Sequence, residues 1–152
     1  MDDLDKKIIA ALQHDFPLSE HPYEVIAEKV GADVSEVFRR VQSLVDEGVI
    51  RRLGVSLDSR KLGYSSTLAA VRVAGGKVET ASEVISAYPE VTHNYLRNDP
   101  FNIWFTLIAA DAGAIAKILE EIRLKLALRP DDVLNLPVRR LFKLDARFKA
   151  SE

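Results

Sequence analysis

The chain has 152 residues, of which 47% are hydrophobic, and a formal net charge of -2. These values are typical of a folded globular protein of one ordinary domain or two small ones, and they give no sign of a polyanionic partner. The absence of cysteine excludes disulfides and thiolate chemistry, the acidic N-terminus differs from a secretory signal, and no segment has the length of a membrane span, so we expect a cytoplasmic protein without a membrane partner.

Residues 1–53 predict a winged helix-turn-helix domain. Apolar residues at helical spacing indicate a first helix, and Pro22 is well placed to open a second one. A third helix is capped by Asp33 and ends before Gly48. The segment Val49-Ile50-Arg51-Arg52-Leu53 then predicts a short strand of the wing type.

Residues 54–64 form a connector whose serine, aspartate and glycine content predicts turns around a short strand. A second domain, 65–152, follows with strands and helices in the order βαββαβ, which is the ferredoxin-like split motif. We expect the strands at 65–73, 91–97, 101–109 and 133–144, and the helices at 78–88 and 112–126. The predicted fold class is therefore α+β.

In this motif the two helices cover one face of the sheet and leave the other face open. If Leu134 and Leu136 in the last strand point toward the helices, alternation turns Asn135, Pro137 and Arg139 to the open face. An open face of this mixed composition must meet water, a ligand or another subunit. We expect it to meet a ligand and a subunit.

The predicted hairpin 91–109 carries more polar chemistry than a hairpin needs. Strand alternation places His93, Tyr95 and Arg97 on one face, within about 13 Å of strand. An imidazole, a phenol and a permanent cation in register are the outline of a ligand site.

Four separated sequence blocks support a family assignment: IRRLG (50–54), DSRKLGY (58–64), VTHNYLR (91–97) and FNIWFT (101–106). The architecture resembles the Lrp/AsnC family of transcription regulators, and the blocks resemble the siroheme decarboxylases, which are enzymes of haem and haem d1 biosynthesis with the shape of such regulators. The resemblance implies removal of carbon dioxide from two acetate side chains of siroheme, which gives didecarboxysiroheme.

The resemblance also implies a partner chain. Siroheme decarboxylases are built from two similar chains, and this chain looks more like the alpha subunit of the haem-pathway pair, so a paralogous beta subunit is expected to complete a heterodimer or a higher assembly. Some family members carry a second histidine in the hairpin turn, where this chain has Asn98, Asp99 and Pro100. If two histidines are needed, the second one should come from the partner.

The family's histidine in the HNYLR block corresponds to His93. It can be a strand histidine that merely packs, a ligand to the iron that the substrate brings, or an imidazolium that donates the proton replacing the lost carboxylate. We expect proton donation. No metal site of the chain's own and no cofactor besides the substrate's iron are expected, because the spacing of His14 and His21 fits no known zinc motif.

Arginines can orient a tetrapyrrole that carries many carboxylates, because the guanidinium fork pairs with carboxylates. The candidates are Arg97, Arg52 and one of the adjacent pair Arg139 and Arg140, for which we choose Arg139; each is otherwise a solvated surface charge.

Other side chains of the hairpin have two readings each. Phe101 is expected in the core, whereas Trp104 can pack in the core or line a macrocycle cavity. Asn94 and Asn102 can bind a propionate or only close the hairpin. We include Trp104, Asn94 and Asn102 among the expected substrate-binding residues.

Two alternatives to an enzyme remain open. The first is a DNA-binding transcription regulator that senses a small molecule or haem. Its third helix would begin with Asp33 and Glu36 where phosphates should lie, although Arg39 and Arg40 follow, so we expect no DNA binding. The second is a haem-binding module without turnover, which would keep His93 and the arginines.

Overall fold

A computed structural model describes residues 1–145 and 147. The chain forms two compact units, the first containing Met1–Val55 and the second Ser56–Phe142. The predicted connector 54–64 is thus divided between them, the expected end of the second domain at 152 lies outside the described residues, and the expected domain limits stay predictions. Among the described helices, none is both long and apolar enough to cross a membrane.

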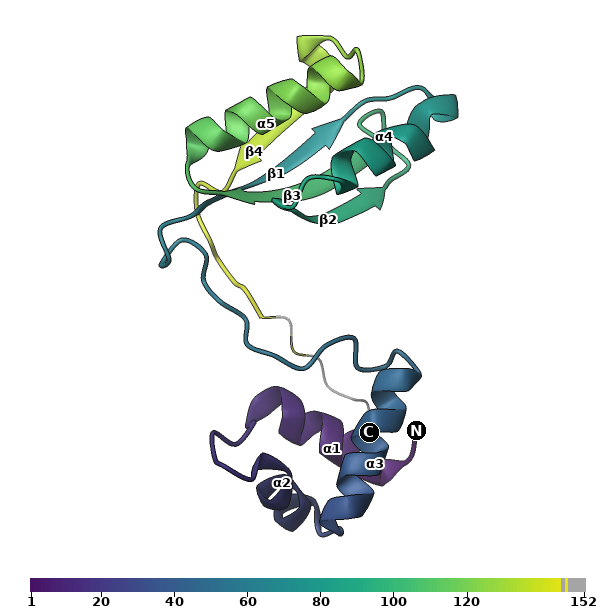
Figure 1. The fold of residues 1–152 in the computed structure, drawn as a ribbon, viewed down its shortest axis with the longest axis vertical. Coiled ribbons are helices and arrows are strands. Elements are labelled where there is room, and N and C mark those ends of the chain that lie inside the picture. Colours follow the sequence, from purple (N-terminus) through teal and green to yellow (C-terminus); the bar gives the residue numbers. More distant parts are fainter. Residues whose placement is uncertain (146, 148–152) are drawn as a thin grey trace. The chain divides into compact units, whose positions relative to one another are not determined.

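The first unit consists of three helices around a small core (Figure 1). Helix α1 (Asp3–His14) starts with a capping box, α2 (Pro22–Val30) starts with proline and ends at Gly31, and α3 (Val34–Asp46) is capped by Asp33. Gly31 has a φ of 72°, a left-handed conformation that favours glycine at a helix end. The core side chains come from all three helices: Ile8, Ile26, Ala27, Val37 and Val41. The predicted helix-turn-helix is therefore confirmed.

Two short strands expected near the end of this unit are absent from the described residues. Neither 49–53 nor the connector 54–64 forms a strand. Ile50 instead donates its backbone N–H to Leu44 at the end of α3, and residues after Asp58 form a turn. A strand needs a neighbour for its backbone hydrogen bonds, and no described segment pairs with these residues.

Arg40 on α3 ties the first unit together. Its guanidinium Nη1 lies 2.8 Å from Asp2 and 2.9 Å from Asp5, and its Nε lies 3.0 Å from Glu36. The bonds to Asp2, Asp5 and Glu36 raise the pKa of Arg40. The backbone N–H of Asp5 and the Arg40 guanidinium lower the pKa of Asp2 to about 2. Arg40 therefore joins α3 to the start of α1.

Replacing Arg40 by methionine is expected to lower the melting temperature of the first unit at neutral pH, because three carboxylates lose their shared cation. Circular dichroism melts measure this effect. The pKa of Asp2 is about 2 in the fold against a usual 3.8, so its ion pair with Arg40 stabilises the fold fully above pH 3.8. This stabilisation is lost as the pH falls toward 2, and the difference in melting temperature between variant and wild type should shrink over the same range. Arg39→Met is the matched control, since Arg39 is 71% exposed.

The second unit is a four-stranded antiparallel sheet with two helices on one face (Figure 1). Its strands lie in the order β2-β3-β1-β4. In chain order the elements are β1 (Ser65–Val71), α4 (Val78–Ser86), β2 (Val91–Leu96), β3 (Ile103–Ala109), α5 (Ala112–Lys125) and β4 (Val133–Pro137), with short 3-10 turns at Gly75–Lys77 and Pro130–Asp132. This is the predicted βαββαβ arrangement.

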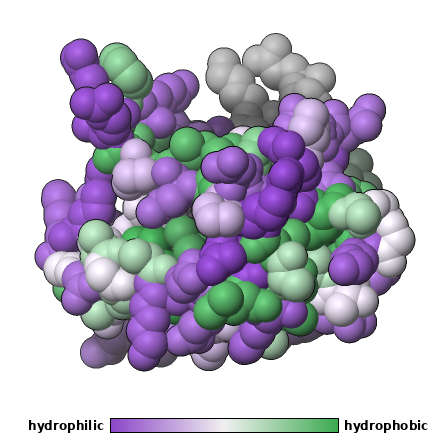
Figure 2. Space-filling model, turned by 90° about the horizontal axis from the view of Figure 1, so that it is seen from above, coloured by the Kyte–Doolittle hydropathy of each residue, from purple (hydrophilic) through white to green (hydrophobic). Residues whose placement is uncertain are grey.

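The core of the second unit lies between the sheet and the two helices. Alternate residues of β3, Ile103, Phe105 and Leu107, are fully buried there, together with Ile85 of α4 and Ile122 of α5. Elsewhere hydrophobic and hydrophilic residues are interleaved on the face of the molecule drawn in Figure 2. Scattered surface apolar residues are common and need no partner.

The last strand differs from its prediction in length and in phase. β4 ends at Pro137 rather than near residue 144, because proline has no N–H for the ladder. Its register pairs Leu134 with Ala70 and Leu136 with Leu68, while Asn135 pairs with Ala69, a residue of the core.

Cross-strand partners point to the same side of a sheet, so Leu134 and Leu136 occupy the open face and Asn135 the helix side. The Thr67 hydroxyl accordingly donates to Asn135 Oδ1 at 2.7 Å. Arg139 follows the end of the strand and is exposed. The prediction that alternation brings Arg139 to the open face is wrong.

Candidate functional site

The open face of the sheet is the face opposite α4 and α5. The register pairs His93 with Thr106 and Tyr95 with Trp104, whereas Asn94 pairs with buried Phe105. Because paired residues share a face, His93, Tyr95, Trp104 and Thr106 lie together on the open side. The middle of this face is apolar, formed by Leu68, Ala70, Ile108, Leu134 and Leu136.

His93 is exposed and held by its neighbours. Its Nδ1 lies 3.0 Å from the hydroxyl oxygen of Thr92, and its ring stacks on Tyr95 with centroids 6.1 Å apart and an interplanar angle of 22°. Among the described residues, none makes a hydrogen bond to Nε2. The orientation of the ring is therefore set through Nδ1, which leaves Nε2 for a bound molecule.

Arg97 and Trp104 complete this group. The Arg97 guanidinium lies over the indole at 5.9 Å from its centroid, and the Arg97 backbone N–H donates to Asn102 O. The Trp104 indole N–H donates to Phe101 O at 2.6 Å, which fixes its ring. We call His93, Tyr95, Arg97 and Trp104 the His93 cluster; it puts a titratable ring, a phenol, a cation and an apolar surface on one uncovered face.

Two predicted substrate-binding residues point elsewhere. The Asn94 amide donates to Ser82 O and to the hydroxyl of Ser86 on α4, on the helix side of the sheet. The Asn102 amide donates to Val73 O at 2.9 Å, and its oxygen accepts from Val73 N–H at 3.0 Å. Both amides thus satisfy groups of their own unit, and neither is presented to a ligand on the open face.

Replacing Asn102 by alanine is expected to cost about 1–3 kcal/mol of stability, because the N–H and C=O of Val73 both lose their partner. Denaturant unfolding measures the loss. Asn98→Ala, in the exposed turn of the hairpin, is the control and should be near neutral. Unchanged stability with weakened ligand binding would show instead that Asn102 contacts the ligand directly.

The remaining predicted arginines are not placed in the His93 cluster. Arg139 and Arg140 follow the end of β4, and the Arg140 guanidinium lies over Phe142 at 4.7 Å. Arg52 belongs to the first unit. The sequence analysis did not single out Thr92 and Thr106, which lie beside His93. A hydroxyl next to a histidine is too common to indicate a site, and the irregular strand pairing between Val91 and His93 cannot be predicted from the sequence.

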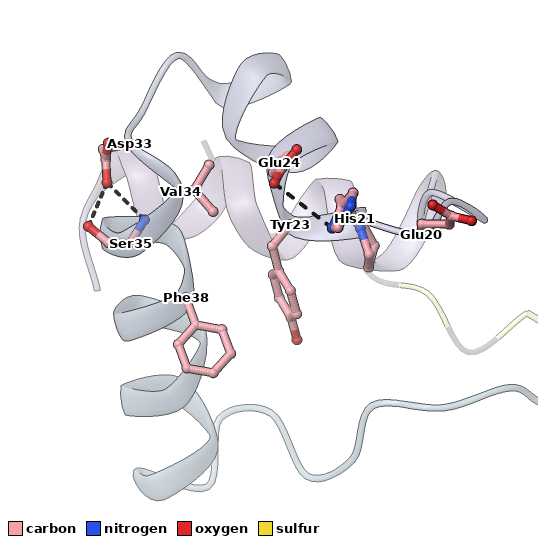
Figure 3. A pocket seen from close by; sticks show the side chains of 9 residues that line it. Glu20, His21, Tyr23, Glu24, Asp33, Val34, Ser35 and Phe38 are labelled. Carbon is pink, nitrogen blue, oxygen red and sulfur yellow. Dashed lines mark hydrogen bonds and ion pairs between the residues drawn. The ribbon is translucent and has the colours of Figure 1, made fainter.

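The first unit has a separate pocket of about 610 Å³ between α2 and α3 (Figure 3). Figure 3 shows the rings of Tyr23 and Phe38 meeting in it, edge to face at 5.5 Å between centroids. Its polar rim includes the carboxylates Glu20, Glu24 and Asp33. No group of three or more potential metal ligands occurs in the part of the chain that the structure describes.

The N-terminal turn of α3 is acidic as expected. The hydroxyl and N–H of Ser35 lower the pKa of Asp33, so this carboxylate stays charged at neutral pH. Arg40, one of the two arginines that follow this turn, is bound to Asp2, Asp5 and Glu36. Both features oppose phosphate binding at this helix.

Comparisons with known proteins place this architecture in a family. Residues 5–51 match the siroheme decarboxylase NirDL-like HTH domain, and residues 61–143 match the AsnC-like ligand binding domain. The chain is 40% identical to the siroheme decarboxylase alpha subunit of Desulfovibrio desulfuricans, over 98% of this chain and 84% of that protein. The alpha subunit of Oleidesulfovibrio alaskensis is 38% identical, over 100% of this chain and 91% of that protein. The chain belongs to the siroheme decarboxylase family.

Solved structures agree with this membership. The siroheme decarboxylase NirDL in complex with an iron-uroporphyrin III analogue is 31% identical with a TM-score of 0.69, over 96% of this chain and 48% of that one. An AsnC family transcriptional regulator from Agrobacterium tumefaciens is 28% identical with a TM-score of 0.79, over 97% of this chain and 96% of that one. The predicted fold class and the resemblance to siroheme decarboxylases are both confirmed.

Proposed function

We propose that this member of the siroheme decarboxylase family removes carbon dioxide from two acetate side chains of siroheme, giving didecarboxysiroheme for the synthesis of haem or haem d1, and that it does so in the cytoplasm. The observation that carries the proposal is the His93 cluster on an uncovered sheet face. The names of its relatives, and the tetrapyrrole analogue bound to NirDL, support the substrate class.

His93 acts as the proton donor in this proposal. The bond between the acetate methylene carbon and its carboxylate breaks, carbon dioxide leaves, and the electron pair stays on the methylene carbon, where the macrocycle can delocalise it. A proton from the imidazolium Nε2 then converts this carbon to a methyl group. Histidine suits the role because its side chain titrates near neutral pH. In the alternative role, a neutral His93 ligates the iron of the substrate.

The other members of the cluster bind and orient the substrate. Arg97 pairs with a carboxylate of the ring through its guanidinium fork. Trp104 and Tyr95 offer flat surfaces against which a macrocycle can pack, and the apolar middle of the open face extends this surface. Arg52 and Arg139 stay candidates for further carboxylate contacts. The chain is proposed to need no cofactor besides the iron within its substrate.

A paralogous beta subunit is proposed to complete the site. The relatives are named alpha subunits, and the NirDL chain is about twice as long as the part that this chain matches. The hairpin turn holds Asn98, Asp99 and Pro100 and no histidine, and three members of the cluster, His93, Tyr95 and Arg97, are exposed rather than enclosed. A second chain on this face would exclude water from the substrate and supply a second histidine.

Anaerobic incubation of siroheme with this chain and its paralogue tests the proposal. Mass spectrometry should show products lighter by one and then two carbon dioxide units. If the Soret band shows that siroheme is bound to the protein but its mass stays unchanged, the chain is instead a haem-binding module without turnover.

A DNA-binding regulator is the second candidate, favoured by the helix-turn-helix unit. An electrophoretic mobility assay with DNA from upstream of its own gene tests it. We expect no shift at physiological salt, because Asp33 and Glu36 stand at the start of α3 and Arg40 is already paired. A specific shift that responds to haem would favour the regulator.

A further inference from the structure

A second cavity, of about 670 Å³, lies in the second unit between the start of α4 and the end of α5. Two of its lining residues, Val73 and Ala81, belong to the core on the helix side of the sheet, so the cavity is separate from the open face that carries His93. Its size lies within the range of about 300–1,000 Å³ that is usual for small-molecule sites.

The cavity wall carries more cations than carboxylates. Four cations line it, Arg72, Lys77, Lys125 and Arg129, against a single carboxylate, Asp132. Asp132 is bound to Arg129 at 3.0 Å and lies 3.8 Å from Arg72. Two carboxylates outside the lining attract its cations electrostatically: Asp131 attracts Arg129, and Glu121 attracts Lys125.

Lys77 is exposed and forms no ion pair with any described residue, and Lys125 lies over the Tyr88 ring at 4.6 Å. The wall therefore keeps positive charge that its own carboxylate does not balance.

We propose that this cavity binds a small organic anion with two or more carboxylate or phosphate groups. The cations come from four places in the chain, Arg72 after β1, Lys77 in the 3-10 turn before α4, Lys125 at the end of α5 and Arg129 before the next 3-10 turn, so they can pair with separate anionic groups. Apolar lining residues such as Leu126 and Leu128 can contact the body of the molecule. The site is independent of the proposed decarboxylation, because no residue of the His93 cluster lines it.

A chain of contacts links this cavity to Trp104. The Arg72 guanidinium lies over the Phe101 ring at 4.6 Å, and Phe101 O accepts the hydrogen bond of the Trp104 indole at 2.6 Å. Trp104 is the single tryptophan of the chain. Its fluorescence therefore offers a signal of binding at Arg72, alongside the amide resonances of the cavity residues.

Titration of the full chain with citrate and with inorganic phosphate, at constant ionic strength, tests the proposal by amide NMR. At least one of the two anions should shift the resonances of Lys77, Thr80 and Ala127 saturably, and not those of His93 and Tyr95. Saturation by citrate alone would identify carboxylates as the ligand groups, and saturation by phosphate alone would identify phosphate.

The Lys77→Gln variant should raise the dissociation constant about five- to tenfold, because one charge-assisted contact is lost. Lys117→Gln, an exposed lysine of α5 outside the cavity, is the matched control and should change nothing. The proposal is overturned if neither anion saturates these resonances, if the shifts map to His93 and Tyr95 instead, or if the two lysine variants behave alike. The loss of a siroheme reaction would not affect this result.

Discussion

Replacing His93 by alanine is expected to lower the rate of siroheme decarboxylation about 10²–10⁴-fold, the usual contribution of general acid catalysis. The carboxyl group can still leave without the imidazole, but the resulting carbanion has no positioned proton and recaptures carbon dioxide. The rate is measured in the presence of the paralogue, by mass spectrometry of the tetrapyrrole. His93 is exposed and lies at the surface of the sheet, so the variant should fold.

The absorbance spectrum of the same variant, His93→Ala, distinguishes the two proposed roles of His93. If the imidazole donates a proton, siroheme should bind with an unchanged Soret band while turnover is lost. If it ligates the iron, the band should shift or disappear. His21→Ala is the matched control, because His21 is a surface histidine of the first unit, 3.9 Å from Glu24. Turnover near the wild-type rate in His93→Ala would remove the central residue of the proposed mechanism.

The purified chain by itself is expected to show little or no turnover, and co-expression with its paralogue should restore it. The structural reason is that the His93 cluster sits on an open face, where water screens charges and solvates the substrate carboxylates. Turnover by the chain alone, by the paralogue alone and by the pair, at equal total protein concentration, measures the effect.

A substitution on the open face tests whether the partner chain binds there. Leu136→Lys, in the apolar middle of the open face, should weaken assembly with the paralogue in size-exclusion chromatography, whereas Leu124→Lys on α5 should not; both leucines are exposed in the single chain. Full turnover by the isolated chain would show that one copy suffices and would end the proposed dependence on a partner.

The elements of this fold were predictable because they depend on short-range pattern. Apolar residues at helical spacing, Pro22 at a helix start and Asp33 as a cap were enough for the three helices of the first unit. Alternation was enough to put His93 and Tyr95 on the same face, since the side chains of a strand alternate whatever lies beside it. The motif blocks around them were enough to indicate the family.

Residues whose role depends on a distant partner were the ones that sequence reasoning misplaced. The phase of β4 is set by its pairing with β1, so Leu134 and Leu136 reached the open face against expectation. The sequence leaves two roles open for Asn94 and Asn102, and in the fold their amides donate to Ser82, Ser86 and Val73 of the same unit. The strand predicted at 49–53 did not form, because a strand exists only with a neighbour.

The sequence by itself thus determined the local elements, the shared face of His93 and Tyr95, and the family. Only the tertiary structure decided which polar side chains are free for a ligand. Arg40 illustrates the difference: nothing near it in sequence shows that Asp2 and Asp5 will bind it. The physical reason is that hydrogen bonds and ion pairs join groups that lie far apart in the sequence. The residues next to a side chain in the sequence do not indicate which distant groups it will contact once the chain has folded.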